Sequence, residues 1–186
     1  MEKRKNLHRR KSIRLKGYDY STPRYYFVTI CTHKRENILG EINNGILSLT
    51  TLGKLAEYTW YDLPNHNSHI GLDEFVVMPN HIHGIIIIQN NDIVGAGSEP
   101  TPTITIRHGL PEIIRQFKTF SAHRINKKRQ MKGYPVWQRN YYEHIIRGDK
   151  ELYQIRKYIL DNPNKWDSDK ENPNYESENF KAKNDH

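Results

Sequence analysis

Two histidines separated by one residue, His81 and His83, form the tightest group of potential metal ligands in the sequence. The residues at 76–78 and 85–88 around them are apolar and mostly β-branched, which is typical of a buried strand hairpin. Side chains alternate between the faces of a strand, so both imidazoles point to one side and Ile82 to the other. Two imidazoles on a rigid strand make half of a divalent-metal site. The alternative, two hydrogen-bonded histidines without a metal, is weakened because burying both side chains is costly.

A tyrosine and an asparagine lie one helical turn apart near the end of an expected helix. Tyr158 and Asn162 are four residues apart and therefore share a helix face. A tyrosine oxygen can attack a phosphodiester, and an amide oxygen can bind a metal ion. The sequence contains 12 Tyr, so Tyr158 taken alone is better explained as a packed aromatic side chain.

These residues require a fold of mixed strands and helices to position them. Strands are expected at residues 24–33, 45–50, 69–78 and 81–89, and residues 136–147 are expected to be mostly extended. Helices are expected from a cap at Thr51 to Leu63, from Pro111 toward Ile125, and from a cap at Asp149 to Asp161 or Asn162. This order predicts an α+β domain with an antiparallel sheet, best matched by a ferredoxin-like sheet with helices stacked on one face.

The net charge of +8 is concentrated in two basic blocks. Residues 1–18 carry eight Lys or Arg against one Glu, residues 107–157 carry thirteen against four acidic residues, and residues 19–106 have a net charge of −5. Separate basic blocks indicate a polyanionic partner, although a disordered arm and a solvated helix face would give the same counts. We therefore divide the chain into a basic arm at 1–20, a catalytic domain at 21–166 and a polar tail at 167–186.

The composition also excludes several classes of protein. The longest purely apolar run, residues 85–88, is far shorter than the ~20 residues that cross a bilayer, so no membrane partner is expected. The basic N-terminus lacks the apolar core of a secretory signal. The single cysteine, Cys31, cannot form an internal disulfide, and a cytoplasmic protein is therefore expected.

Three segments together resemble the single-tyrosine HUH transposases, in particular the REP-associated tyrosine transposases of the IS200/IS605-like group. They are MPNHIHGIII at 78–87, VWQRNYYEHIIR at 136–147 and KYILDNPNKW at 157–166. The resemblance implies a ferredoxin-like fold, a single-stranded DNA hairpin as substrate, and Mg²⁺ or Mn²⁺ as the metal. It assigns His81 and His83 as metal ligands and Tyr158 as the nucleophile. It places Asn162 at the third ligand, where related transposases have Gln.

The function implied by this resemblance is cleavage and rejoining of DNA at hairpin-flanked sites through a 5′-phosphotyrosine intermediate. Tyr141 and Tyr142 are competing nucleophiles, but they belong to the segment expected to be extended. Contacts to DNA are expected from basic and amphipathic side chains of the arm and the second basic block, namely Arg9, Arg10, Lys11, Arg14, Arg115, Lys118, Arg124, Lys127, Lys128, Arg129, Trp137, Gln138 and Arg147.

Three other functions were weighed against this one. A histidine-triad nucleotide hydrolase needs a further histidine at position 85, which is Ile85. A replication initiator or relaxase of the same superfamily is usually larger than this chain. A non-cleaving protein that binds nucleic-acid hairpins with the same fold stays open, and a homodimer and a monomer are both compatible with the family.

Overall fold

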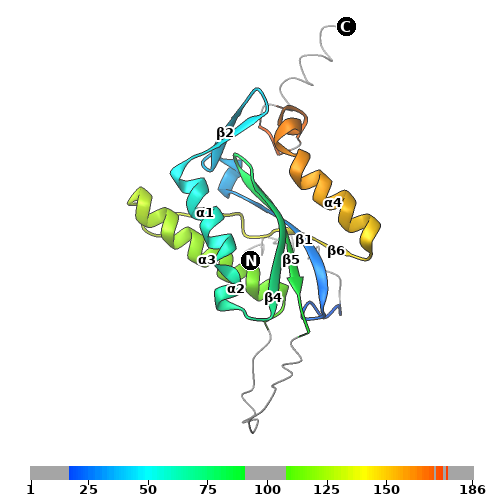
Figure 1. Ribbon diagram of the computed structural model, residues 1–186. Coiled ribbons are helices and arrows are strands. Elements are labelled where there is room, and N and C mark those ends of the chain that lie inside the picture. Colours follow the sequence, from blue (N-terminus) through cyan, green and yellow to red (C-terminus); the bar gives the residue numbers. More distant parts are fainter. Residues whose placement is uncertain (1–16, 91–107, 170, 174, 176–186) are drawn as a thin grey trace, which may run out of the picture.

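Four antiparallel strands form the sheet that carries the histidine pair. They are β1 (Arg24–Cys31), β4 (Ile70–Val77), β5 (His81–Ile88) and β6 (Tyr142–Ile146), in the order β4-β5-β1-β6 (Figure 1). The computed structural model describes residues 17–90, 108–169, 171–173 and 175. β1 pairs with β5 and with the edge strand β6, and its register with β5 sets Cys31 opposite His81 and Thr29 opposite His83.

Helices cover both faces of this sheet. α1 (Thr51–Tyr61), α2 (Leu63–His66) and α3 (Leu110–Arg129) lie on one face, and α4 (Asp149–Asp161) lies on the other, as Figure 1 shows. The order β1-α1-β4-β5-α3-β6 is the ferredoxin-like arrangement, so the predicted fold class is confirmed. The expectation of helices on one face only is wrong. β5 is apolar on both faces, with Ile82 toward α1 and Ile85 toward α4, and both need cover.

Several element boundaries differ from the sequence prediction. The caps expected at Thr51 and Asp149 lie one residue earlier, where the Thr50 side chain accepts from the Gly53 N–H and Gly148 precedes α4. α3 continues four residues past Ile125. The segment expected to be extended from residue 136 enters the sheet only at β6, with one isolated bridge from Trp137 to Thr32 before it.

A two-stranded hairpin, separate from the main sheet, follows β1. It consists of β2 (Gly40–Asn43), which the sequence analysis missed, and β3 (Ile46–Leu49), which was expected at 45–50. Asn44 and Gly45 form its turn, both with positive φ. This pair of residues is a strong signal for a tight hairpin turn. A short 3-10 helix, η2 (Pro163–Ser168), extends the chain beyond α4 and was also not expected.

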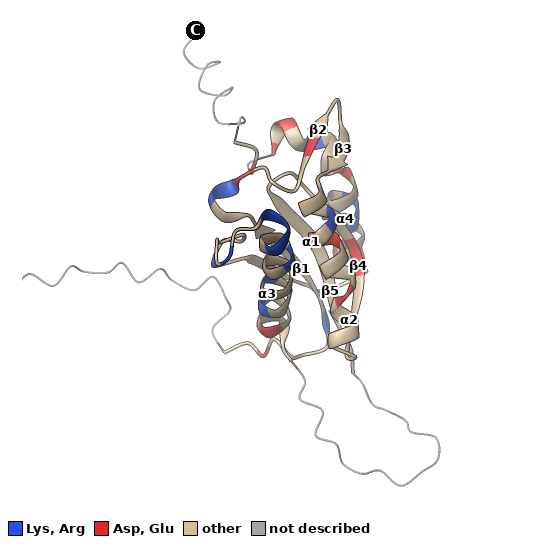
Figure 2. Cartoon of the chain, turned by 90° about the vertical axis from the view of Figure 1, so that its left-hand side faces the viewer, with Lys and Arg blue, Asp and Glu red and all other residues tan. Residues whose placement is uncertain are grey.

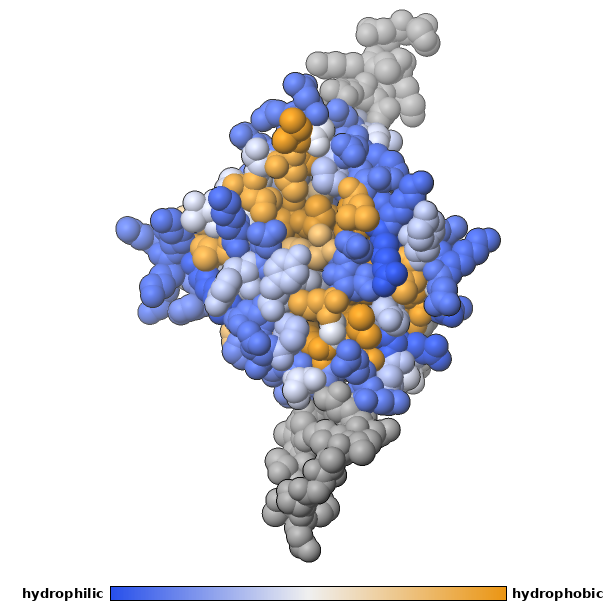
Figure 3. All heavy atoms as spheres, in the orientation of Figure 1, coloured by the Kyte–Doolittle hydropathy of each residue, from blue (hydrophilic) through white to orange (hydrophobic). Residues whose placement is uncertain are grey.

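Two groups of buried side chains stabilise the two faces of the sheet. The larger group joins α1 and α3 to the sheet around Trp60 and Phe117, and the smaller one joins α4 to it around Phe27, Ile85 and Ile159. None of the described helices is long and apolar enough to span a membrane. In the space-filling view, apolar side chains form broken patches between hydrophilic ones on the visible face (Figure 3).

Gly84, between the second histidine and Ile85, lets Trp60 of α1 lie directly against β5. A Cβ at this position would be 2.4 Å from Trp60 Cζ2 and 3.0 Å from Phe75 Cδ2. We expect Gly84→Ala to lower the free energy of unfolding by about 1–3 kcal/mol, because the packed ring cannot withdraw without displacing Phe75. Equilibrium unfolding in urea measures this loss.

Gly148→Ala is the matched control for this substitution. A Cβ at Gly148 meets nothing within 4 Å, and the φ of 178° is one that any residue adopts. The control should stay within about 0.5 kcal/mol of the parent protein. Equal losses in both variants would contradict the assignment of the effect to Trp60 packing.

Candidate active site

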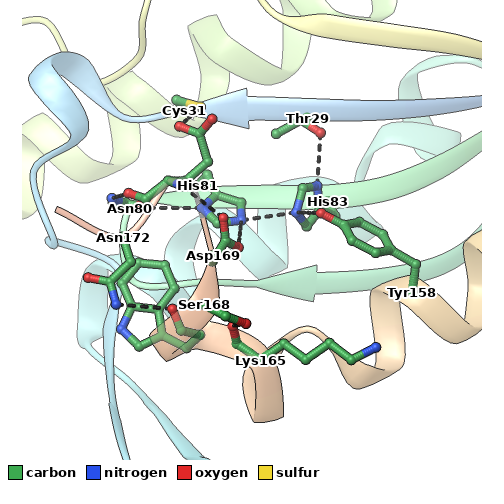
Figure 4. A network of polar contacts seen from close by, with 12 residues as sticks. Thr29, Cys31, Asn80, His81, His83, Tyr158, Lys165, Ser168, Asp169 and Asn172 are labelled. Carbon is green, nitrogen blue, oxygen red and sulfur yellow. Dashed lines mark hydrogen bonds and ion pairs between the residues drawn. The ribbon is translucent and has the colours of Figure 1, made fainter. Parts of the chain in front are cut away.

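The two histidines open β5 and point toward α4. The Nε2 atoms of His81 and His83 are 3.0 Å apart, and both side chains are buried (Figure 4). Ile82 between them points to the opposite face and packs in the larger core. The strand alternation inferred from the sequence therefore brings the two imidazoles together at the sheet surface beneath α4.

The other nitrogen of each imidazole is held by a neighbouring polar side chain. Asn80 Oδ1 is 2.8 Å from His81 Nδ1, so this nitrogen donates and leaves His81 Nε2 with a free lone pair. Thr29 Oγ1 is 2.9 Å from His83 Nδ1, and its hydroxyl can donate or accept. Partners of this kind fix the ring orientation and tautomer of metal-binding histidines.

Burial keeps both imidazoles neutral. Desolvation is the main cause that lowers the pKa of His81 well below its usual range and lowers the pKa of His83 to about 3. The positive charge that a second protonated histidine would place nearby lowers the pKa of His81 further. Neutral imidazoles are the form in which histidine binds metals.

Tyr158 of α4 supplies a hydroxyl next to His83. Its oxygen lies 3.3 Å from His83 Nε2 (Figure 4), and its ring contacts the rings of His83 and Phe27. Burial raises the pKa of Tyr158, partly offset by a hydrogen bond with the Asn162 side chain. The competing tyrosines lie elsewhere: Tyr141 packs in the larger core, and Tyr142 is exposed with its ring against Phe27.

Two oxygen-bearing side chains C-terminal to Tyr158 are candidate ligands: Asn162 is linked to the pair through its hydrogen bond with Tyr158, and Asp169 lies next to His81. Asn162, which follows α4, is buried, and its Oδ1 has no hydrogen-bond partner. Asp169, which follows η2, has Oδ2 3.8 Å from His81 Nε2. Because His81 is neutral, this contact is not an ion pair, and burial raises the pKa of Asp169 as well.

Asp169 is the site residue that the sequence analysis did not find, since it falls in the segment assigned to the polar tail. Nothing in its local sequence distinguishes it from the neighbouring acidic residues. Residues close to it are tied to the domain by hydrogen bonds: Asn80 Nδ2 donates to the Glu171 carbonyl, and Asn172 Nδ2 donates to the Trp166 carbonyl. The start of this segment therefore belongs to the surroundings of the histidine pair.

The donor set fits a divalent cation. Among the described residues, His81, His83 and Asp169 each offer one ligand atom, and these atoms lie within 4.8 Å of one another. The orphaned Oδ1 of Asn162 is a further buried acceptor of the kind that an ion satisfies. Imidazole nitrogens and carboxylate or amide oxygens are ligands that divalent cations accept in proteins.

The residues expected to contact DNA differ in the contacts that they make within the protein. Lys118 Nζ donates to the carbonyls of Gln138, Arg139 and Asn140, at 2.9, 3.3 and 3.0 Å, so it holds the segment before β6. Trp137 is buried, and its Nε1 donates to Ser121 at 2.8 Å, which leaves its ring in the core and unavailable for stacking on bases.

The other cations of the second basic block divide between paired and exposed positions. Arg124 pairs with Asp62 at 2.7 Å, and Arg115 pairs with Glu112. Figure 2 shows several Lys and Arg positions along α3. The exposed members at the end of α3 and before α4 are Lys127, Lys128 and Arg147, while Arg129 is half-buried over the ring of Tyr134. Arg9, Arg10, Lys11 and Arg14 lie outside the described residues.

A groove of about 670 Å³ runs between α3 and residues 134–141. Its lining combines Arg115, Lys118 and Arg139 with aromatic side chains, and Gln138 also lines it. Gln138 is half-buried and reaches the groove from the segment that Lys118 holds. Of the residues predicted to bind DNA, Arg115, Lys118, Trp137 and Gln138 are thus brought together in this groove.

Comparison with known proteins gives two relatives and one solved structure of note. An uncharacterized protein of Haemophilus influenzae is 38% identical over 170 residues, which cover 88% of this chain and 93% of the relative. A second H. influenzae protein, provisionally named a REP-associated tyrosine transposase, is 34% identical over 88 residues, 47% of this chain and 46% of its own length.

The solved structure is a REP-associated tyrosine transposase bound to a REP hairpin. It superposes with a TM-score of 0.51 at 20% identity, covering 77% of this chain and 68% of the other, and therefore supports the fold. No family model matches the sequence.

The buried histidines give the protein a specific dependence of stability on pH. In the unfolded chain a histidine takes up its proton near pH 6.5, whereas in the folded protein the pKa of His83 is about 3. The unfolded state therefore binds more protons below pH 6.5, and stability falls as the pH is lowered. We expect a slope of up to about 1.4 kcal/mol per pH unit from His83 between pH 6 and 4.5.

Chemical denaturation at a series of pH values in the presence of EDTA measures this slope. The window above pH 4.5 separates the histidines from carboxylates such as Asp62 and Asp73, whose lowered pKa values affect stability only below it. His83→Gln should reduce the slope. A slope that is the same in the parent and in this variant would contradict the burial of a neutral His83.

Proposed function

We propose that the chain is a REP-associated tyrosine transposase and acts as a metal-dependent single-stranded DNA transesterase. It cleaves and rejoins DNA at hairpin-flanked sites, with Tyr158 as the nucleophile. The observation that carries the proposal is the Tyr158 hydroxyl 3.3 Å from His83 Nε2, beside a pair of buried neutral imidazoles. A nucleophile and a candidate metal site are thereby adjacent on two different elements.

The chemistry uses one tyrosine oxygen and one phosphodiester. The Tyr158 oxygen bonds to phosphorus, the phenol proton is lost, and the bond to the leaving 3′-oxygen breaks, which gives a 3′-hydroxyl and a 5′-phosphotyrosine. Attack by another 3′-hydroxyl reverses the step and frees the tyrosine, so rejoining needs no nucleotide hydrolysis.

The raised pKa of Tyr158 means that it enters the reaction as a phenol. His81 and His83 would hold a divalent cation, which when bound would supply positive charge that favours loss of the phenol proton and stabilises a non-bridging phosphate oxygen. Asn80 and Thr29 keep the His81 and His83 rings in place, and Phe27 packs against the edge of the Tyr158 ring. These contacts hold the nucleophile before substrate binds.

We propose that both nearby oxygens take part in holding the cation. Asn162 Oδ1, expected from the sequence, lacks any other partner, and Asp169 has its carboxylate next to His81. The two imidazoles and the two side-chain oxygens would together hold the cation. Asp169 would add the negative charge that a site of neutral ligands lacks.

Covalent capture of DNA tests the proposed nucleophile. Incubation with a labelled hairpin oligonucleotide carrying single-stranded flanks and Mn²⁺ should give a protein–DNA adduct that survives SDS. Tyr158→Phe should lower adduct formation at least about 100-fold, because no other oxygen replaces the nucleophile. The matched control is Tyr153→Phe, which alters an exposed tyrosine of the same helix.

Two results of this assay would contradict the proposal. Adduct from Tyr158→Phe at the parental rate would show that another residue is the nucleophile. Tight hairpin binding by the parent protein without any adduct would favour the non-cleaving hairpin-binding protein instead.

Metal titration tests the two oxygen ligands separately. Asn162→Ala and Asp169→Asn should each raise the Mn²⁺ concentration for half-maximal adduct formation by about 10-fold or more, because each removes one donor. Asp167→Asn, an exposed acid of the same segment, should leave this concentration unchanged. A variant that behaves like Asp167→Asn identifies an oxygen that does not bind the metal.

A further inference from the structure

We propose that Asp73 of β4 and Arg156 of α4 form a clamp that sets the rotation of α4 and thereby the position of Tyr158. The inference rests on the function proposed above, and both residues are positioning residues that act through the helix. Asp73 and Arg156 are far apart in sequence and belong to no motif of the sequence analysis. Their contact links the helix of the nucleophile to an edge strand of the sheet.

The contact is a two-pronged pairing of a guanidinium with a carboxylate. Arg156 Nε donates to Asp73 Oδ1 at 2.8 Å, and Arg156 Nη2 donates to Oδ2. Asp73 Oδ1 also accepts the backbone N–H of Glu74 at 2.8 Å, which fixes the carboxylate rotamer. A pair with two parallel hydrogen bonds defines an orientation as well as a distance.

The strand presents this carboxylate at an irregularity in the sheet. The pairing of β4 with β5 shifts register between Leu72 and Phe75, so Asp73 lies in a bulge. Bulges change the direction of side chains and are common next to functional sites. The Asp73 side chain is 11% exposed while that of Arg156 is 42% exposed, so the fixed partner is on the sheet and the mobile one on the helix.

The geometry of α4 explains why one contact governs the tyrosine. Leu152, Ile155 and Ile159 form the stripe that packs on the sheet. At about 100° per residue, Arg156 and Tyr158 lie on opposite flanks of this stripe. A rotation of the helix about its axis would therefore lift Tyr158 while lowering Arg156, or the reverse.

The apolar stripe by itself leaves this rotation weakly determined. Its side chains fix the distance between helix and sheet, but dispersion and burial have no strong direction. On the flank of Tyr158, Glu151 ties the first turn of α4 to the end of β6: it accepts the Arg147 N–H at 2.7 Å and lies 2.7 Å from His144 Nε2. The Asp73–Arg156 pair adds the directional contact on the flank opposite Tyr158.

The stability contributed by a pair this exposed is small, so its effect should appear in the reaction rather than in the fold. The three variants to compare are Asp73→Arg, Arg156→Asp and the double exchange of both residues. Each single variant should slow single-turnover adduct formation with the hairpin oligonucleotide and Mn²⁺ by about 10-fold or more, because small misplacements of a nucleophile are costly. The dissociation constant for the hairpin should stay within about 2-fold, since neither residue is proposed to touch DNA.

The double exchange restores a pair of opposite charges and should recover the rate to within about 3-fold of the parent. Lys150→Glu, which reverses a charge at an exposed position of the same helix, is the matched control and should leave the rate unchanged. A double variant no faster than the single ones would overturn the clamp. Equal rates in the parent and the single variants would overturn it too.

Hydrogen exchange of the α4 amides provides a measurement that does not depend on activity. It should accelerate by about 10-fold in the single variants and recover in the double variant, while β1 and β5 amides keep their protection as evidence of an intact sheet. If the variants show this pattern of exchange but the parent protein forms no adduct, the proposed function is rejected and the clamp on α4 stands. Unchanged exchange in α4 together with a slower reaction would overturn the clamp and leave the function standing.

Discussion

The burial of two neutral imidazoles at the start of β5 is the constraint on which the site depends. A buried histidine without partners is costly, and here three contacts offset part of the cost: Asn80 and Thr29 on the outer nitrogens, and the Tyr158 hydroxyl at His83 Nε2. The Nε2 atoms of the two rings face each other at 3.0 Å, and a cation bound between them and Asp169 would satisfy both. The requirement for partners on both sides of each ring thus brings together β1, β5 and α4.

The sheet separates the histidine pair from the basic residues of α3. β5 buries Ile82 under α1 and α3 and presents His81 and His83 to α4. Because side chains alternate along the strand, one face of β5 packs in the core and the other carries the two imidazoles. Six of the thirteen Lys and Arg residues of the second basic block lie on α3, on the face of the sheet opposite the histidines, while Lys150, Arg156 and Lys157 lie on α4. Positive charge near the imidazoles would weaken cation binding. The cations of α3 lie in a different layer from the candidate metal ligands (Figure 2).

Local patterns made part of this arrangement predictable, and long-range pairing made the rest unpredictable. The spacing of His81 and His83 on a strand and of Tyr158 on a helix are properties of a few adjacent residues, and the structure has each on the element that was expected. Asp169 and the pairing of Asp73 with Arg156 depend on how distant segments meet, which no local spacing encodes. Lys118 and Trp137 were predicted as DNA contacts from their residue types. The structure adds that Lys118 Nζ donates to backbone carbonyls and that Trp137 Nε1 donates to Ser121, contacts that local spacing does not encode.

The C-terminal segment shows how the composition of a region can conceal its role. Residues 167–186 carry six acidic residues against three basic ones, a pattern expected of a solvated tail. Yet Glu171 accepts hydrogen bonds from Arg35 and from Cys31, the residue opposite His81 in the sheet, and its carbonyl accepts from the Asn80 side chain that orients His81. The same Asn80 side chain thus joins the segment to the imidazole. Displacing the segment would remove Asp169 from the site and one of the contacts that hold Asn80, so the position of this segment and the orientation of His81 are coupled.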